Sequence, residues 1–598
     1  MGRTGGDGGP RAAWNALLAL ALIRAATAFM PSMWAWGLNV QRFVAPLPGW
    51  LLWLAMVLVL IPAVGAGANT RLERAGDRLL GGAWTPWLVA LAAAALVWSL
   101  PDRTWFTGDF LLRQGAAETG AFPAIFTQSL PLERFLNQVL PRLFGTFSRL
   151  DPNVASRTIE ALAAAALGVV SVRLAREWGL AGSAAAVAAG TILFGGYLSF
   201  FTGLGKPASV LCVLTASSLL GATRLVRSGR GGMLLGLALA VAFLTHRSAL
   251  AIAPLWIAAL ILAGRAHHGA GGRTRFELAV AAGLPLLAGL IAAPLLLRII
   301  REFDLPRHVL PSGAHGAGIM AAAFAPLHLI DLANLLLFYT PALVTAAALL
   351  MAPGPRGKAG AEQRLPVVLA LSFVPLLLFI HPIQGVFRDL EVFAPAGVAC
   401  ALLAARVVGE ALQSRRLPAW LAPALLAAVA APALQWLLHF HDPALGFARA
   451  RAIALEAPAR PEVERARLWD VLAYRAFRDR HWDRAVEASE QAVRYAPHPR
   501  AVTMLAIART YSGDYRGAES LYVELARRFP EDPLAWLGLG GVSVRLGDSL
   551  WSARALEKRD GYAPESREAR LIRRHLRAFP ETWPTTAESA GGRGVVGR

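Results

Sequence analysis

LAVAAGLPLLAGLIAAPLLL (residues 278–297) runs through twenty residues without a charged side chain. A helix of about 20 apolar residues is what crossing the hydrocarbon core of a bilayer requires. The rest of the chain shares this character, because 56% of its 598 residues are hydrophobic and only 16% are charged. Soluble domains carry about 25% charged residues. The composition therefore excludes a conventional soluble enzyme and a disordered chain, and it predicts a polytopic membrane protein.

Similar apolar runs stand before and after this one, which itself extends over about 276–299. The first run follows Arg3 and Arg11 as a signal peptide would, but Arg24 within it and the apolar mass behind it favour a retained helix. We expect an all-α fold, a transmembrane bundle of about 13 spans. The other runs lie near 13–30, 50–66, 84–100, 158–174, 181–201, 209–225, 232–245, 249–263, 328–351, 365–380, 394–410 and 417–439.

The formal net charge of +20 reports topology. Basic residues gather on alternate loops, as at 71–78, 224–230 and 265–275, which the positive-inside rule assigns to the cytoplasm together with the tail 1–12. An odd number of spans then puts the C-terminal part outside, as in a bacterial cytoplasmic (inner) membrane. No block of basic residues interleaved with aromatic ones occurs, so nucleic acid is excluded as a partner.

After the membrane domain, 13–439, the hydropathy drops and a period emerges in residues 440–582. Units start near Ala466, Pro499 and Pro533, 33 and 34 residues apart. This pattern resembles the tetratricopeptide repeat, an α-solenoid that binds peptides or other domains. The generic alternative is a set of unrelated helical hairpins. Residues 583–598 read as a disordered tail.

The longest outer loop, about 101–157, mixes acidic and basic residues with aromatic ones. A carboxylate at the apolar boundary is partly desolvated and can act as a base towards a hydroxyl. The structural alternative is that Asp109 pairs with Arg113, four residues on, and caps a surface helix.

On the segment TWFTGDF (104–110) the chain resembles the GT-C superfamily of polytopic glycosyltransferases. These enzymes take sugar from a polyprenyl-phosphate donor and carry acidic residues on a large first outer loop. The resemblance implies Asp109 as the first candidate for the catalytic carboxylate and Asp102 as the second. In relatives such a residue is the general base, or it binds the acceptor or a divalent cation. The sequence itself shows no metal-ligand spacing.

Two more outer motifs agree with this resemblance. In FGGYLSFFTGLGKPAS (194–209) the charged residue is Lys206, where the resemblance expects an acid; it could hold a donor phosphate or extend to the membrane surface. FLTHRSAL (243–250) places His246 and Arg247 at the next outer junction.

The last two motifs are LHLIDLANLLLFYTPAL (327–343) and IHPIQGVFRDLEVFAPAG (380–397). Arg388 suits a phosphate because a guanidinium binds two oxygens at once. The alternative is an Arg388–Asp389–Glu391 network that anchors a short loop, and Leu390 stands where the resemblance expects an aromatic residue. The polar residues expected at the site are His246, Asp331, Asn334, His381, Asp389 and Glu391.

Together these motifs suggest transfer of a sugar from a lipid-phosphate donor to an acceptor on the extracytoplasmic face. The leaving phosphate would be held by Arg388, Lys206, Arg247 and Arg113. The repeats would recruit a protein or glycan acceptor, or a protein partner. Two alternatives stay open: a catalytically inactive membrane-anchored repeat scaffold, and an O-antigen-ligase or polymerase-like enzyme. No Walker loop, GxSxG or HExxH motif occurs.

Overall fold

The computed structural model describes residues 8–107, 113, 116, 122–148, 152–269, 271–309, 318–352 and 360–561. Every regular element in these ranges is a helix, and they contain no strand, which confirms the all-α class. The chain divides into two compact units: the first extends to Ala452 and takes in Glu456–Pro458, and the second starts at Ala459 and takes in Ile453–Leu455. The division falls between residues 452 and 459. The drop in hydropathy comes earlier in the sequence, after residue 439.

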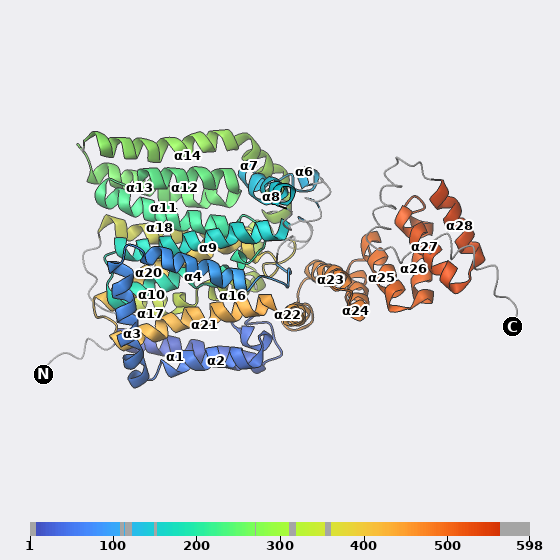
Figure 1. Cartoon of the computed structure of the whole chain (residues 1–598), viewed down its shortest axis with the longest axis horizontal. Coiled ribbons are helices and arrows are strands. Elements are labelled where there is room, and N and C mark those ends of the chain that lie inside the picture. Colours follow the sequence, from blue (N-terminus) through green and yellow to red (C-terminus); the bar gives the residue numbers. More distant parts are fainter. Residues whose placement is uncertain are drawn as a thin grey trace. The chain divides into compact units, whose positions relative to one another are not determined.

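The first unit is a bundle of helices with short 3-10 and π segments at its junctions (Figure 1). Its elements up to residue 252 are α1 (Gly8–Phe29), η1 (Asn39–Phe43), α2 (Pro46–Leu58), α3 (Pro62–Gly81), α4 (Thr85–Ser99), α6 (Phe122–Ile125), α7 (Pro131–Arg134), η2 (Phe135–Val139), α8 (Leu140–Ser148), α9 (Pro152–Glu177), α10 (Gly182–Leu193), η3 (Gly196–Phe201), α11 (Ala208–Ser228), α12 (Gly232–Thr245) and η4 (Arg247–Ile252). The later elements are α13 (Ala253–Ala266), α14 (Gly272–Ile299), η5 (Ile300–Val309), α15 (Ile319–Ala323), α16 (Pro326–Tyr339), α17 (Ala342–Met351), η6 (Ala361–Arg364), α18 (Leu365–Ser372), α19 (Val374–Phe379), η7 (Leu390–Phe393), α20 (Ala394–Gln413), η8 (Ala419–Leu421), α21 (Ala422–His441) and α22 (Pro443–Leu455).

In the described part of the chain, eight helical segments are long and apolar enough to cross a membrane, or up to ten if each of two bent pairs is one span. Helices of this length and composition indicate a multi-pass membrane protein. Three further apolar helices, Thr85–Ser99, Gly182–Leu193 and Gly232–Thr245, are shorter.

Two of the expected spans contain a sharp bend. The run 50–66 contains a bend of 97° between α2 and α3, and the run 328–351 contains one of 103° between α16 and α17. Each bend lies at a proline, Pro62 or Pro341. Proline lacks the backbone N–H of the helix ladder and pushes the preceding residue towards extended geometry. Ile61 accordingly has φ −77° and ψ 120°.

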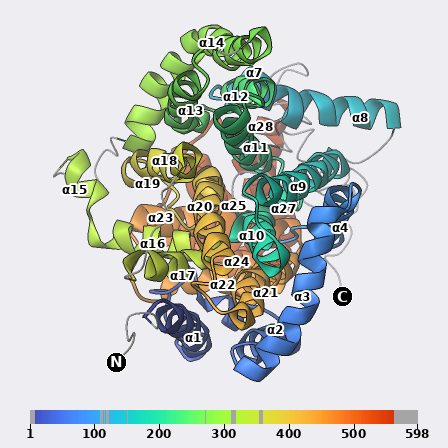
Figure 2. The ribbon, with the colours of Figure 1, turned by 90° about the vertical axis from the view of Figure 1, so that its left-hand side faces the viewer.

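Burial separates an inner layer from an outer one. All twelve residues of α10 are buried, and so are most residues of α20. α14 instead turns large apolar side chains outward: Leu290 is 73% exposed and Ile291 is 63% exposed. Figure 2 shows α20 in the centre of the bundle and α14 at its edge. An apolar outer layer suits contact with lipid rather than with water.

A buried polar contact explains the arginine in the first apolar run. Arg24 is only 1% exposed, and its Nη2 donates a hydrogen bond to Oε1 of Gln435 on α21. Gln435 Nε2 in turn donates to the carbonyl of Gly49, at 2.8 Å. An ionisable residue inside a membrane bundle faces the interior and finds a polar partner there, so Arg24 joins α1 to α21.

Up to residue 561, the second unit has six helices in succession, each packed against the next. Two Gly-Asp pairs separate neighbouring helices: Gly513 and Gly547 have φ of 89° and 73°, and Asp514 then accepts a hydrogen bond from the Gly517 N–H. Glycine in the left-handed region ends a helix, and aspartate caps the start of the next one. The helices are α23 (Glu462–Arg478), α24 (Trp482–Tyr495), α25 (Pro499–Ser512), α26 (Tyr515–Arg528), α27 (Pro533–Leu546) and α28 (Ser549–Asp560).

Candidate functional site

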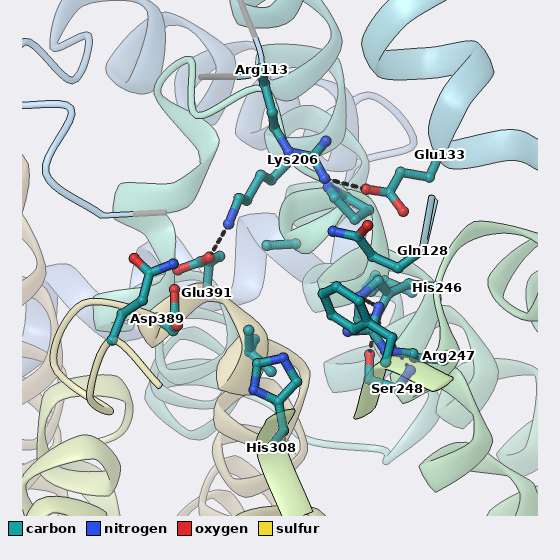
Figure 3. A pocket seen from close by; sticks show the side chains of 16 residues that line it. Arg113, Gln128, Glu133, Lys206, His246, Arg247, Ser248, His308, Asp389 and Glu391 are labelled. Atoms are coloured by element: carbon teal, nitrogen blue, oxygen red, sulfur yellow. Dashed lines mark hydrogen bonds and ion pairs between the residues drawn. The ribbon is translucent and has the colours of Figure 1, made fainter. Parts of the chain in front are cut away.

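A polar cavity of about 140 Å³ lies where several helix junctions of the first unit meet (Figure 3). Its walls come from six separated parts of the chain: Arg113, residues 128–133 at α7, the η3–α11 connection with the start of α11, the start of η4, η5, and the segment before α20. We call this space the polar cavity. Its charged and polar lining residues are Arg113, Gln128, Glu133, Lys206, His246, Arg247, Ser248, His308, Gln384, Asp389 and Glu391.

A buried carboxylate positions the loop that carries Lys206. Glu160 of α9 accepts hydrogen bonds from the backbone N–H groups of Gly203, Leu204 and Gly205, at 2.6, 2.8 and 2.8 Å. The loop can present three successive N–H groups because Gly203 and Gly205 have φ of 110° and 66°. Successive N–H groups form a concave site for an anion, and here Glu160 fills it.

Lys206 and Glu391 form an ion pair inside the polar cavity, between Nζ and Oε1. Both side chains are buried, with exposures of 10% for Lys206 and 3% for Glu391. Glu391 belongs to η7, which Tyr339 holds through a hydrogen bond from its hydroxyl to the Leu390 carbonyl. The second oxygen of Glu391, Oε2, is buried and has no hydrogen-bond partner among the described residues.

Arg113 lies against two aromatic rings at another wall. Its guanidinium carbon is 4.8 Å from the ring centre of Phe126 and 5.6 Å from that of Phe122. Nη2 donates to Glu133 Oε1 at 2.5 Å. Nε and Nη1 are buried and lack a hydrogen-bond partner in the described part of the chain. Arg113 therefore has donors to offer a polar ligand.

His246 and Arg247 stand at the third wall. Arg247 Nε pairs with Asp304 Oδ2 at 2.6 Å, and Arg247 Nη1 lies 3.1 Å from His246 Nε2. A guanidinium only donates, so we assign His246 Nε2 as the acceptor. Burial, followed by the charges of Arg247, Arg113 and Lys206, holds the pKa of His246 well below its usual value. The imidazole is thus neutral, surrounded by three cations.

An apolar cavity of about 200 Å³ adjoins the polar one. The two share a wall that includes His246, Arg247, His308 and Asp389. The two spaces therefore lie side by side, and the surface of the second is mainly apolar. The apolar residues around the second cavity are Ile300, Val309, Leu376, Ile380, Pro382 and Val392.

Asp331 and Asn334 do not line either cavity. Asp331 Oδ1 accepts a hydrogen bond from the indole of Trp36 at 2.8 Å, and Asn334 Oδ1 accepts one from the Gly37 N–H at 2.8 Å. These bonds hold the segment between α1 and η1 against α16, which is a structural use of both side chains.

Of the two acids taken as catalytic, Asp109 lies outside the described residues. Asp102 is buried and does not line either cavity. Its Oδ1 accepts hydrogen bonds from the N–H groups of Thr104 and Trp105, at 2.7 and 3.0 Å. This geometry favours a role for Asp102 in shaping its own loop.

Arg388 and His381 also stand apart from the polar cavity, although they share a segment with Asp389 and Glu391. Arg388 is buried, with 7% of its surface exposed. The ring of His381 packs on that of His328, with centroids 4.1 Å apart. In this segment, Asp389 and Glu391 thus line the polar cavity, whereas Arg388 and His381 do not.

Several residues in or behind the site had no predicted role, among them Glu133, Glu160, Asp304 and His308. Glu160 could have been found as an acid within an otherwise apolar run. Asp304 and His308 follow the run 276–299 directly, at the end of that apolar segment.

The described residues contain no group of three or more His, Cys, Asp or Glu side chains that could hold a metal ion. Comparison of the chain with protein-family models, with curated proteins and with solved structures finds no match.

Proposed function

We propose that this protein transfers a glycosyl group from a lipid-phosphate donor to an acceptor at the extracytoplasmic face of a bacterial inner membrane. This proposal rests on two cavities that share a wall, one polar and one mainly apolar. Cationic residues line the polar cavity, and the apolar cavity shares its wall. A lipid-linked phosphate sugar has the same two parts, an anionic head and a hydrocarbon chain.

The unsatisfied groups in the polar cavity suit a phosphate that carries a sugar. Arg113 Nε and Nη1 are donors without a partner among the described residues, as a phosphate needs. Gln128 Oε1 and Gln384 Oε1 are buried acceptors without a partner among the described residues. Sugar hydroxyls can donate to them, which would remove the cost of leaving buried polar atoms unpaired.

In the transfer, the cations of the cavity would stabilise the charge that develops on the leaving phosphate. Lys206, Arg113 and Arg247 reach the cavity from three different walls. Each has a carboxylate partner in the free protein: Glu391, Glu133 and Asp304. These pairs offset the cost of burying the cations before the donor arrives.

The basic residues at one end of α11 support this orientation. The helix starts at Ala208, which lines the polar cavity, and ends at Ser228. Arg224 and Arg227 are in its last turns, at the end away from the cavity. The positive-inside rule would make that end cytoplasmic and the cavity extracytoplasmic. The eight long helices, the two bent pairs and the three shorter apolar helices together make the thirteen spans that we propose.

We further propose that the second unit is a tetratricopeptide-type array that recruits the acceptor or a protein partner. Its six helices follow the expected period, with Gly-Asp pairs at residues 513–514 and 547–548. The competing proposal is a catalytically inactive membrane-anchored scaffold. One observation favours it: the three cations of the polar cavity already have carboxylate partners.

Transfer itself separates the two proposals. Purified protein in lipid nanodiscs would be incubated with polyprenyl-phosphate sugars that carry a radioactive sugar, together with a membrane extract as the source of acceptor. An enzyme moves the label from the lipid to a water-soluble or protein-bound product, and Lys206→Met lowers that rate. An inactive scaffold leaves the label on the lipid at the rate of empty nanodiscs.

A further inference from the structure

Transfer to a hydroxyl needs a group that accepts the hydroxyl proton, and three carboxylates line the polar cavity: Glu133, Asp389 and Glu391. Resting on the proposed function, we propose that Glu391 is the residue that accepts this proton. The three carboxylates differ in their hydrogen-bond partners.

Glu391 alone of the three offers a buried oxygen with no hydrogen-bond partner in the described part of the chain. Glu133 is bound to the guanidinium of Arg113, and Asp389 has a polar interaction of its own. The side chain of Glu391 is only 3% exposed, so bulk water does not cover Oε2. A buried acceptor without a donor costs free energy, which a hydroxyl placed in the cavity would recover.

The surroundings of Glu391 fix the direction of this oxygen. Lys206 Nζ binds Oε1. The bond from the Tyr339 hydroxyl to the Leu390 carbonyl anchors the backbone of η7 next to it. With one oxygen and the backbone held, the other oxygen keeps its place while the acceptor binds. Such a fixed position is what general base catalysis requires.

The acceptor oxygen forms a bond to the anomeric carbon of the sugar, and its proton moves to Glu391 Oε2. The bond between the anomeric carbon and the phosphate oxygen breaks, and its electron pair remains on the phosphate. The lipid phosphate leaves with one more negative charge, which Lys206, Arg113 and Arg247 stabilise, and Glu391 later releases its proton to water.

The test uses the full-length protein in nanodiscs and the labelled donor that wild type transfers fastest. Glu391→Gln keeps the size of the side chain and removes its basicity. Glu410→Gln is the matched control, because Glu410 is also paired with a cation, Arg406, but lies on α20 away from the cavity. Donor binding and melting temperature are measured for every variant.

We expect E391Q to bind the donor as well as wild type does and to lower the transfer rate by about 10²–10⁴-fold. Formate added to Glu391→Ala should restore part of the rate, because it supplies a carboxylate in the space left by the side chain. A residue needed only for structure would not respond to formate. E410Q should transfer at the wild-type rate.

Transfer by E391Q at the wild-type rate would overturn the role of Glu391 while the proposed function stands. If formate restored the transfer rate of Asp109→Ala but not that of Glu391→Ala, the residue that accepts the hydroxyl proton would be Asp109 instead of Glu391. A wild-type protein that binds no lipid phosphate and transfers no sugar would overturn the proposed function itself.

Discussion

Lys206 and Glu391 meet in the polar cavity as a buried ion pair, although 185 positions separate them in the sequence. Lys206 comes from the connection between η3 and α11, and Glu391 comes from η7 before α20. Neither residue could be held in place by its own segment alone. The pair therefore depends on contacts behind the cavity wall, and several of these can be tested separately.

Glu160 should support the Lys206 loop through the hydrogen bonds that its two side-chain oxygens accept. Glu160→Gln leaves an amide that can accept with one oxygen only, whereas Glu160 accepts three backbone hydrogen bonds with two oxygens. We expect a loss of about 1–3 kcal/mol in stability, because buried N–H groups are left without an acceptor. The measurement is thermal unfolding in nanodiscs, with E410Q as control. Equal melting temperatures for E160Q and E410Q would contradict this role.

The two glycines of that loop should differ in their tolerance of alanine. Gly205, at φ 66°, occupies the left-handed helical region, so we expect Gly205→Ala to cost about 1–2 kcal/mol. Gly203, at φ 110°, lies where a Cβ atom is rarely accommodated, and Gly203→Ala should cost more. Chemical denaturation of the two variants side by side checks the order. A smaller loss for G203A would show that the loop geometry is wrong.

The contact between Arg24 and Gln435 should behave as a coupled pair. Gln435→Leu leaves a buried guanidinium without its acceptor and should destabilise the protein by about 1.5–3 kcal/mol. In Arg24→Met with Gln435→Leu, both polar groups are gone, and most of that loss should be recovered. A double-mutant cycle on melting temperature measures the coupling. Purely additive effects would mean that the two side chains do not interact.

The neutral His246 should make the protein sensitive to acid. Because its pKa is lowered in the folded state, the unfolded chain binds the proton more readily, and stability falls as the pH drops below about 6.5. His246→Gln should remove this contribution, which has a slope of up to about 1.4 kcal/mol per pH unit. Melting temperatures of both proteins between pH 8 and pH 5 provide the check. Parallel curves would contradict the assignment.

The sequence predicted helices well because the apolar runs are long, as the fit between 158–174 and α9 illustrates. It did not predict the bends at Pro62 and Pro341, since hydropathy averages over a window and ignores the missing N–H of proline. Arg24 was correctly kept inside a helix, but its partner Gln435 is more than 400 residues away, and no local pattern reveals it.

For the site, the position of a residue at a helix junction helped to predict whether it lines the polar cavity. Its residue type alone did not. Lys206, Arg247 and Glu391 were selected from junction motifs, and all three line the polar cavity. Asp331 was selected by the same reasoning, yet it binds the indole of Trp36. Whether a junction residue turns to the cavity or to a neighbouring loop depends on tertiary packing, which the sequence pattern does not encode.

On the proposed function, the two adjoining cavities hold the phosphate and the hydrocarbon chain of one lipid. The most direct measurement compares equilibrium binding of a polyprenyl phosphate with that of the corresponding polyprenol, to the wild-type protein and to Lys206→Met. We predict that the phosphate binds wild type at least about tenfold more tightly than the alcohol and that the preference shrinks in K206M, because a buried cation contributes to binding only when an anion meets it. Equal affinity of wild type for the phosphate and the alcohol would contradict the account.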